Sequence, residues 1–321
     1  MARSRERDGE PSKRAARGML ASLLMMVSYR PSVLSLLAWQ WKRALVFVAS
    51  AIVAQTLHEY VGWSHLVVPT LPLAVTGGAI GIFVSFRTNS CYARWWEGRQ
   101  LWGRLVNASR HFGSQVATSV PAAEAKELVR LQIAYVHLLR CVLREQDPWT
   151  DERVVGATTE LERATWKGDR NPASAILHRE REILVSLANA GTLPELRLHA
   201  MDQTLATLLD VQGGCERIKR TPFPRGYAFI SDRLILALGM LLPFGMVKDL
   251  DWVTIPINLL VCGAFALISE AGRVLEDPFT MFYNGLPLSA LSTTIEVNLR
   301  QRLGETDVPP LPVPDQNGIL M

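Results

Sequence analysis

An apolar run changes into a charged one without a break in GIFVSFRTNSCYARWWEGRQLWG, residues 81–103. Arg-Thr-Asn at 87–89 ends the apolar run, and Arg94, two tryptophans and Glu97 follow. Neither proline nor glycine stands at the change, so nothing there is expected to stop a helix. The sequence therefore predicts one helix that leaves an apolar environment and enters a polar one.

Composition points to a membrane protein with a polar middle. Of the 321 residues, 49% are hydrophobic and 20% are charged. The hydrophobic residues concentrate toward both ends and the charged residues between them, as in chains whose membrane segments flank a polar region. The net charge of +4 is modest and no nucleic-acid-reading motif accompanies it, so nucleic-acid binding is not expected.

Four stretches are apolar enough to be transmembrane helices. They cover residues 44–63, 66–86, 227–247 and 252–272. Short linkers join them in two pairs, which predicts two helical hairpins. The two linkers share a single basic residue, Lys248, whereas the chain ends and the middle hold nearly all the others. Under the positive-inside rule, both termini and the middle face the cytoplasm.

The predicted organisation has five parts. They are a cytosolic N-terminal segment, a transmembrane hairpin, a cytosolic helical region, a second hairpin and a cytosolic C-terminal segment, at residues 1–40, 41–86, 87–226, 227–275 and 276–321. The charged N-terminus is not followed by a short apolar segment with a cleavage site, so we do not interpret it as a signal peptide. The Pro-rich tail at 307–318 is expected to be extended or disordered.

Helical periodicity runs through the middle region. It predicts long helices within 122–145, 171–191 and 193–220, with short helices in the loop region 147–172. Asn171 followed by Pro172 is typical of a helix start. No stretch alternates as a strand does, and no internal repeat is present.

Motifs for catalysis, nucleotide binding and metal binding are missing from the sequence. There is no phosphate-binding loop, no HExxH, no GxSxG and no pair of histidines at helical spacing, so the chain is not expected to be an enzyme. The four cysteines are isolated, which argues against a disulfide framework or a zinc site. Gly77 and Gly81 form a GxxxG pair inside an apolar helix, a pattern that favours close helix packing.

One face of the second apolar stretch stands out. Gly78, Ile82 and Phe86 are spaced by four and share a helix face. In an oligomer this face would form stacked apolar rings, and in a monomer it would face lipid or core. Arg87 has two readings, as an arginine at the lipid–water boundary or as a residue on the wall of a water-filled path.

Three segments resemble the bacterial branch of the bestrophin family. They are FRTNSCYARWWEGRQLWG at 86–103, CERIKRTPFP at 215–224 and ISEAGRVLEDPF at 268–279, in the family's order, with GLPL at 285–288 after them. The resemblance covers roughly residues 20–300. It implies an all-α membrane protein with four transmembrane helices in two hairpins and a large cytosolic helical region, assembled as a homopentamer around a central pore.

The same resemblance assigns the pore residues. The pore neck falls on Phe86, Ile82 and Gly78, the face that periodicity singles out, and glycine at 78 leaves the outermost ring wide or absent. Below the neck, a vestibule is expected at Arg87, Thr88 and Asn89. A second, cytosolic constriction is expected around Leu196 and Leu198.

Other motif residues are expected to be structural. These are Arg94, Trp95, Trp96, Glu97, Glu276, Asp277 and Pro278. Ala93 stands where bacterial relatives often have aspartate, so a local ion pair is expected to be missing. Glu270 and Arg273 are three residues apart on one predicted helix and are expected to pair.

No cofactor, metal site or calcium clasp is expected. Animal members follow the matching Pro-Phe stretch with a run of acidic residues that binds calcium. Here Glu-Asp-Pro-Phe is followed by TMFYNGLPL, residues 280–288, which has no carboxylate. Calcium needs several oxygen ligands, which this stretch does not supply as side chains.

The resemblance implies a passive ion channel with a hydrophobic neck gate in the bacterial inner membrane. Its partners would be copies of itself, the lipid bilayer and permeant monovalent ions. The family name implies chloride or other monovalent anions, whereas the aliphatic Ile82 in the neck leaves a monovalent cation (sodium) channel open. A non-conducting membrane scaffold and a secondary transporter are the alternatives from other classes, although a transporter usually has internal repeats.

Overall fold

The computed structural model describes residues 40–62, 68–282, 284–314 and 320, and these residues form helices and loops but no strand. The predictions for the N-terminal segment up to residue 39, for most of the first hairpin linker and for the end of the Pro-rich tail lie outside the described residues. The chain divides into two compact units. We call them the apolar unit, residues 40–97 with 221–278, and the polar unit, residues 98–220 with 279–314.

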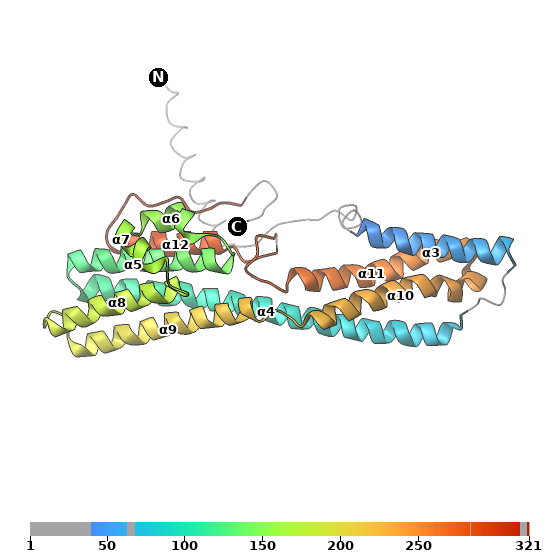
Figure 1. Ribbon diagram of the computed structural model, residues 1–321, viewed down its shortest axis with the longest axis horizontal. Helices are drawn as coiled ribbons and strands as arrows, with labels where there is room; N and C mark the ends of the chain where they lie inside the picture. Colours follow the sequence, from blue (N-terminus) through green and yellow to red (C-terminus); the bar gives the residue numbers. More distant parts are fainter. Residues whose placement is uncertain (1–39, 63–67, 283, 315–319, 321) are drawn as a thin grey trace, which may run out of the picture. The chain divides into compact units, whose positions relative to one another are not determined.

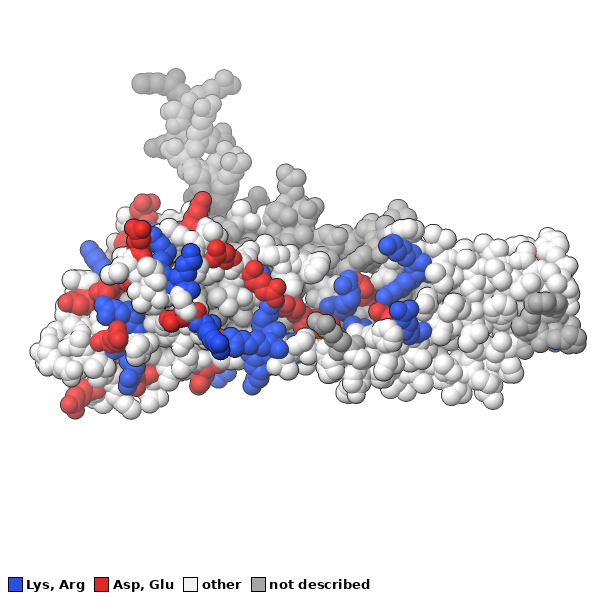
Figure 2. Space-filling model, in the orientation of Figure 1, with Lys and Arg blue, Asp and Glu red and all other residues white. Residues whose placement is uncertain are grey.

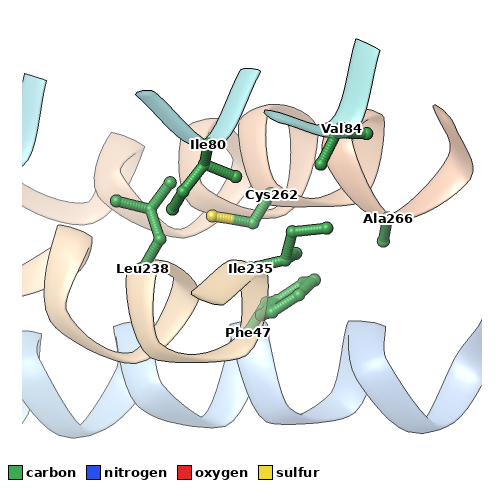
Figure 3. Close-up of a cluster of buried hydrophobic side chains, with 7 residues drawn as sticks. All are labelled: Phe47, Ile80, Val84, Ile235, Leu238, Cys262 and Ala266. Atoms are coloured by element: carbon green, nitrogen blue, oxygen red, sulfur yellow. The ribbon is translucent and has the colours of Figure 1, made fainter. Parts of the chain in front are cut away.

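Four helices build the apolar unit. They are α3 (Trp41–Tyr60), the first part of α4 (Thr70–Ser119), α10 (Arg225–Leu250) and α11 (Thr254–Val274), with the short η3 (Asp251–Val253) between the last two. The helices α3, α10 and α11 pack on one another and lie side by side in Figure 1. All four helices contribute to one core, which Figure 3 shows: Phe47, Ile80, Val84, Ile235, Leu238, Cys262 and Ala266.

Small and polar residues hold these helices close together. A Cβ at Gly81 would lie 3.3 Å from the ring of Phe265, so α4 and α11 approach closely there, as the GxxxG pattern predicts. Asn258 of α11 is buried, and its Nδ2 donates hydrogen bonds to the carbonyl oxygens of Phe47 at 2.9 Å and Gly239 at 3.0 Å. One amide therefore ties together α3, α10 and α11 without leaving its own donor unpaired.

Two segments of the described chain are long and apolar enough to cross a membrane, judged by length and composition. One lies within Thr70–Ser119, and the other is Gly226–Val274, which contains α10 and α11. The first predicted span, now α3, is not among them. The fold is all-helical as predicted, and the number of four spans stays a prediction.

The polar unit is a second helical bundle. It contains the rest of α4, α5 (Ala122–Leu143), η2 (Pro148–Thr150), α6 (Glu152–Gly156), α7 (Glu160–Trp166), α8 (Pro172–Asn189), α9 (Glu195–Arg220) and α12 (Leu288–Arg302). The predicted long helices are thereby confirmed, and so is the start of α8, where Asn171 Oδ1 accepts a hydrogen bond from the Ser174 amide at 3.2 Å. Blue and red spheres are interleaved over this unit in Figure 2, as on solvated helices.

Helix α12 is an element that the sequence analysis missed. It packs on α5, and its buried side chains include Leu288, Leu291, Ile295 and Leu299. Their spacing of three and four is the periodicity of an amphipathic helix and could have predicted it. Residues 288–302 of the C-terminal segment are thus part of the polar unit's core.

Helix α4 runs without interruption for 50 residues, through the change from apolar to charged sequence at 87–89. Its residues up to Glu97 belong to the apolar unit and those from Gly98 to the polar unit. The prediction of one continuous helix is confirmed.

Candidate functional site

The predicted neck residues lie on an exposed face of α4. Ile82 is 76% exposed and Phe86 is 63% exposed, although both are large apolar side chains in an apolar helix. A Cβ built on Gly78 would meet no atom within 4 Å. On the opposite side of the same helix, Ile80 and Val84 are buried in the core. The helix thus packs with one face and leaves the face of Gly78, Ile82 and Phe86 without a partner in its own chain.

The exposed face continues beyond the three predicted positions. Leu71 and Val75 are exposed before Gly78, and Tyr92 and Trp96 are exposed after Phe86. The spacing of three or four residues keeps all of them on one side of the helix. We call this surface the α4 face. It is apolar along its length except near Asn89, which is also exposed.

The structure corrects the prediction for Arg87. This residue was expected to face a water-filled vestibule, but its exposed fraction is 1% and Nη1 donates a hydrogen bond to Ser269 Oγ of α11 at 2.9 Å. The next residue, Thr88, also turns toward α11, where a Cβ on Gly272 would lie 3.0 Å from its hydroxyl oxygen. Successive helix residues are rotated by about 100°, so Phe86 and Arg87 lie on different faces. Of the three predicted vestibule residues, only Asn89 lies on the α4 face.

Arg87 belongs to a chain of polar contacts that includes all four helices of the apolar unit. Ser269 Oγ donates to Asp232 Oδ1 of α10 at 3.2 Å, and Asp232 Oδ2 accepts an ion pair from Arg43 Nη2 of α3 at 3.1 Å. A buried guanidinium needs acceptors. Ser269 Oγ accepts from Arg87 Nη1 and leads on to the carboxylate of Asp232, whereas Arg87 Nε is buried without a hydrogen-bond partner among the described residues. The sequence analysis missed Arg43, Asp232 and Ser269 as a group, although Asp232 near the start of a predicted span was a signal.

Arg94 brings the three family motifs together. Its Nε donates to the carbonyl oxygen of Glu276 at 3.2 Å, and its Nη1 donates to the carbonyl oxygen of Thr221 at 2.7 Å. Arg94 lies in the first motif, Thr221 in the second and Glu276 in the third. Position 93 is alanine, and the Arg94 guanidinium binds these backbone carbonyl groups. These acceptors do not depend on the side chains at 221 and 276.

The remaining motif residues lie around this junction. Trp95 stacks on Tyr92 with ring centroids 6.1 Å apart, and Trp96 is 47% exposed. Pro278 is buried, whereas Glu97, Glu276 and Asp277 are half-buried. The predicted pair of Glu270 and Arg273 is confirmed, with Arg273 Nε donating to Glu270 Oε1 at 2.9 Å.

The predicted cytosolic constriction falls in the polar unit. Leu196 and Leu198 lie in the first turn of α9, where Leu196 is 79% exposed and Leu198 is half-buried. Like Ile82, Leu196 has an apolar side chain that is not covered by its own chain. Its assignment to a constriction stays a prediction.

The described residues offer no cluster of three or more His, Cys, Asp or Glu that could hold a metal ion. The four cysteines are buried and form no disulfide. What the site presents is therefore an apolar helix face beside a buried polar network.

The comparisons agree with the motif pattern. Residues 14–301 match the family model of the bacterial and fungal bestrophin proteins. The voltage-dependent anion channel-forming protein YneE of Salmonella typhi is 38% identical over 248 residues, which cover 76% of this chain and 80% of that protein. The protein of the same name from Escherichia coli K12 is 36% identical over 247 residues, covering 77% of this chain and 81% of that protein.

A solved structure has the same fold. The crystal structure of a bacterial bestrophin homologue from Klebsiella pneumoniae superposes with a TM-score of 0.78 and 30% sequence identity, and the match covers 82% of this chain and 98% of that one. Structures of variants of that homologue match similarly, for example the L177T variant with a TM-score of 0.78.

Proposed function

This chain belongs to the bacterial and fungal bestrophin family, and from that membership we propose that it is a passive ion channel for chloride and other monovalent anions. The family and the relatives indicate a membrane channel rather than an enzyme. The relatives named as voltage-dependent anion channel-forming proteins support the choice of anions.

The observation that carries the proposal is the exposure of Ile82 and Phe86 on the α4 face. Two large apolar side chains, 76% and 63% exposed, lie on a helix whose opposite side buries Ile80 and Val84. In a homopentamer, five copies of α4 around one axis bring these side chains together as two apolar rings. Such a constriction expels water and blocks ions until it widens or wets, which is a hydrophobic gate. Gly78 has no side chain with which to form a third ring.

The proposed subunit crosses the bacterial inner membrane four times, with both termini in the cytoplasm. Figure 2 supports the span assignment, because α3, α10 and α11 are mostly white on the visible face and the charged spheres gather where α3 begins and α11 ends. The polar unit then lies on the cytoplasmic side. Its partners are four further copies of the chain, the lipid bilayer and the permeant ions, with no cofactor.

Planar-bilayer recording of the purified protein under a salt gradient tests the proposal. A reversal potential near the chloride equilibrium potential is the expected result. A reversal potential near the sodium equilibrium potential would show a cation channel of the same architecture, the alternative that the aliphatic Ile82 leaves open. Absence of current, or saturable coupled uptake in liposomes, would contradict the channel and favour a scaffold or a transporter.

A further inference from the structure

A cavity of about 350 Å³ lies in the apolar unit where α3 begins and α11 ends. It is lined by Gln40, Trp41, Lys42, Arg43, Glu270 and Arg273. None of these residues belongs to the α4 face, so the cavity is a separate feature from the proposed neck. Blue and red spheres gather at this end of the unit in Figure 2.

The cavity carries an excess of positive charge. Three basic side chains line it against one carboxylate, Glu270, and that carboxylate is already bound by Arg273. Lys42 lies 5.7 Å from the centroid of the Trp41 ring, and the structure places no carboxylate within 4.0 Å of its ammonium among the described residues. The charge of Lys42 is therefore available to an anion.

Arg43 adds a second cation to the lining. Its Nη2 is paired with Asp232, but its Nη1 is buried and has no hydrogen-bond partner within the described part of the chain. A buried charged donor without an acceptor costs free energy. That atom is enclosed by the protein, so Arg43 acts on the cavity through the charge of its partly exposed guanidinium rather than through Nη1.

The start of α3 adds to the positive potential. This helix has 20 residues, and its N-cap residue Gln40 makes no side-chain cap to the first turn. The first amide groups of a helix point out of its N-terminus and favour a bound anion, phosphate in particular. A cavity, basic side chains and a helix N-terminus thus converge at one place.

The position of the cavity indicates where the anion comes from. Trp41 is 55% exposed at the start of an apolar helix, which is the usual place of tryptophan at a membrane surface. The headgroup phosphates of a bilayer lie at that depth, and clustered Lys and Arg beside a span attract anionic lipids.

We propose that this cavity binds the phosphate of an anionic phospholipid, held by Lys42, Arg43, Arg273 and the N-terminus of α3. The site requires that the chain be embedded in a membrane and is independent of whether it conducts ions. The anionic headgroup balances the charge of Lys42.

Thermal unfolding of the detergent-solubilised protein tests the proposal without reference to current. Titration with short-chain phosphatidylglycerol is expected to raise the Tm by roughly 5 °C at saturation, whereas phosphatidylcholine is not. Lys42→Gln is expected to weaken binding about fivefold, because a basic residue near an anionic membrane contributes about 1 kcal/mol. Lys42→Arg should restore it.

Two further variants make the test specific. Glu270→Gln removes the one carboxylate among the described lining residues, so it is expected to tighten binding of phosphatidylglycerol. Lys248→Gln removes one charge from the end of α10, which η3 joins to the start of α11 rather than to its end, and should leave binding unchanged. An equal loss with Lys248→Gln would show general attraction of lipid and overturn the site. If inorganic phosphate at the same concentration stabilises the protein equally, the bound anion is not a lipid headgroup. If neither phosphatidylglycerol nor phosphate raises the Tm, the proposal is refuted.

Discussion

Arg87 of α4 donates a hydrogen bond to Ser269 Oγ of α11 at 2.9 Å, although Phe86, the residue before it, is 63% exposed. The helix therefore keeps a charged group inside the subunit at the depth where it leaves an apolar face bare. Burial of Arg87 explains how the helix passes from apolar to charged sequence without exposing a guanidinium to lipid. Ser269 in turn donates to Asp232, which also pairs with Arg43, so this network holds two guanidinium groups and one carboxylate.

Replacing Arg87 should destabilise the apolar unit. Arg87→Met removes the donor to Ser269 and leaves polar groups buried without it, so we expect a loss of about 1–3 kcal/mol in unfolding free energy. Thermal unfolding in detergent measures this. Asn89→Ala, an exposed change on the same helix, is the control and should cost less than about 0.5 kcal/mol. An equal Tm for wild type and Arg87→Met would refute the structural role.

The neck assignment predicts opposite steric effects at Ile82. Ile82→Ala widens the apolar ring and should raise ion flux severalfold, whereas Ile82→Phe should alter the anion-to-cation permeability ratio. Both follow from gating by dewetting, which depends on the width and character of the constriction. Flux into reconstituted liposomes and reversal potentials are the measurements. Leu260→Ala changes another exposed apolar residue, on α11, and should alter neither quantity; unchanged flux in both Ile82 variants would remove Ile82 from the neck.

The buried pair of His137 and Glu296 should make stability fall in acid. His137 Nε2 lies 2.9 Å from Glu296 Oε2 between α5 and α12. Burial lowers the pKa of His137 below its ordinary 6.5 despite the hydrogen bond that Glu296 accepts, which opposes the shift. Burial also raises the pKa of Glu296, but its hydrogen bond with His137 and the charges of His137, Arg153 and Arg300 outweigh it, so that pKa ends below 4.5.

Both depressed pKa values act in the same direction. The folded state binds fewer protons than the unfolded state, so the stabilisation is present above pH 6.5 and is lost as the pH falls below it, by up to about 1.4 kcal/mol per pH unit. Unfolding by urea between pH 7.5 and 5.5 measures the slope, which His137→Gln should flatten. His178→Gln removes an exposed histidine and should leave the slope of stability against pH unchanged. If His137→Gln has the same slope as the wild type, groups other than His137 cause the loss of stability in acid.

Glu180 should have the opposite effect. Its carboxyl is buried in α8, both oxygens have no hydrogen-bond partner among the described residues, and burial raises its pKa well above 4.5. The folded state thus holds a proton that the unfolded state releases, so stability is full in acid and is lost as the pH rises toward the raised pKa. We expect Glu180→Gln to unfold at higher urea than wild type at pH 8, by about 1–3 kcal/mol. Glu182→Gln, an exposed change on the same helix, is the control, and a destabilised Glu180→Gln would contradict the prediction.

Calcium should have no effect on conduction. The stretch after Pro278 has no carboxylate until residue 296, so it lacks the acidic run that clasps calcium in animal relatives. Bilayer currents recorded with a calcium chelator and with millimolar calcium should agree. Currents that disappear on chelation and return with calcium would show that ligands from elsewhere in the chain form a site.

Much of the fold could be predicted because it depends on local pattern. The helices of the polar unit follow from periodicity and from the cap at Asn171, and the continuity of α4 follows from the absence of a breaking residue at 87–89. Helix α12 was missed although its leucine spacing was visible. The polar network of Arg43, Arg87, Asp232 and Ser269 could not be predicted, because its members are up to 226 positions apart and meet only when four helices pack.

The sequence by itself determined the helical class, the family and the face that Gly78, Ile82 and Phe86 share, since each depends on spacing or on short motifs. The tertiary structure decided which side each polar residue of that helix turns to. A rotation of about 100° per residue separates Phe86 from Arg87, but only the position of α11 determines that Arg87 is buried and Phe86 is not. For the same reason, the structure alone revealed that Arg94 joins the three motifs through backbone carbonyl groups.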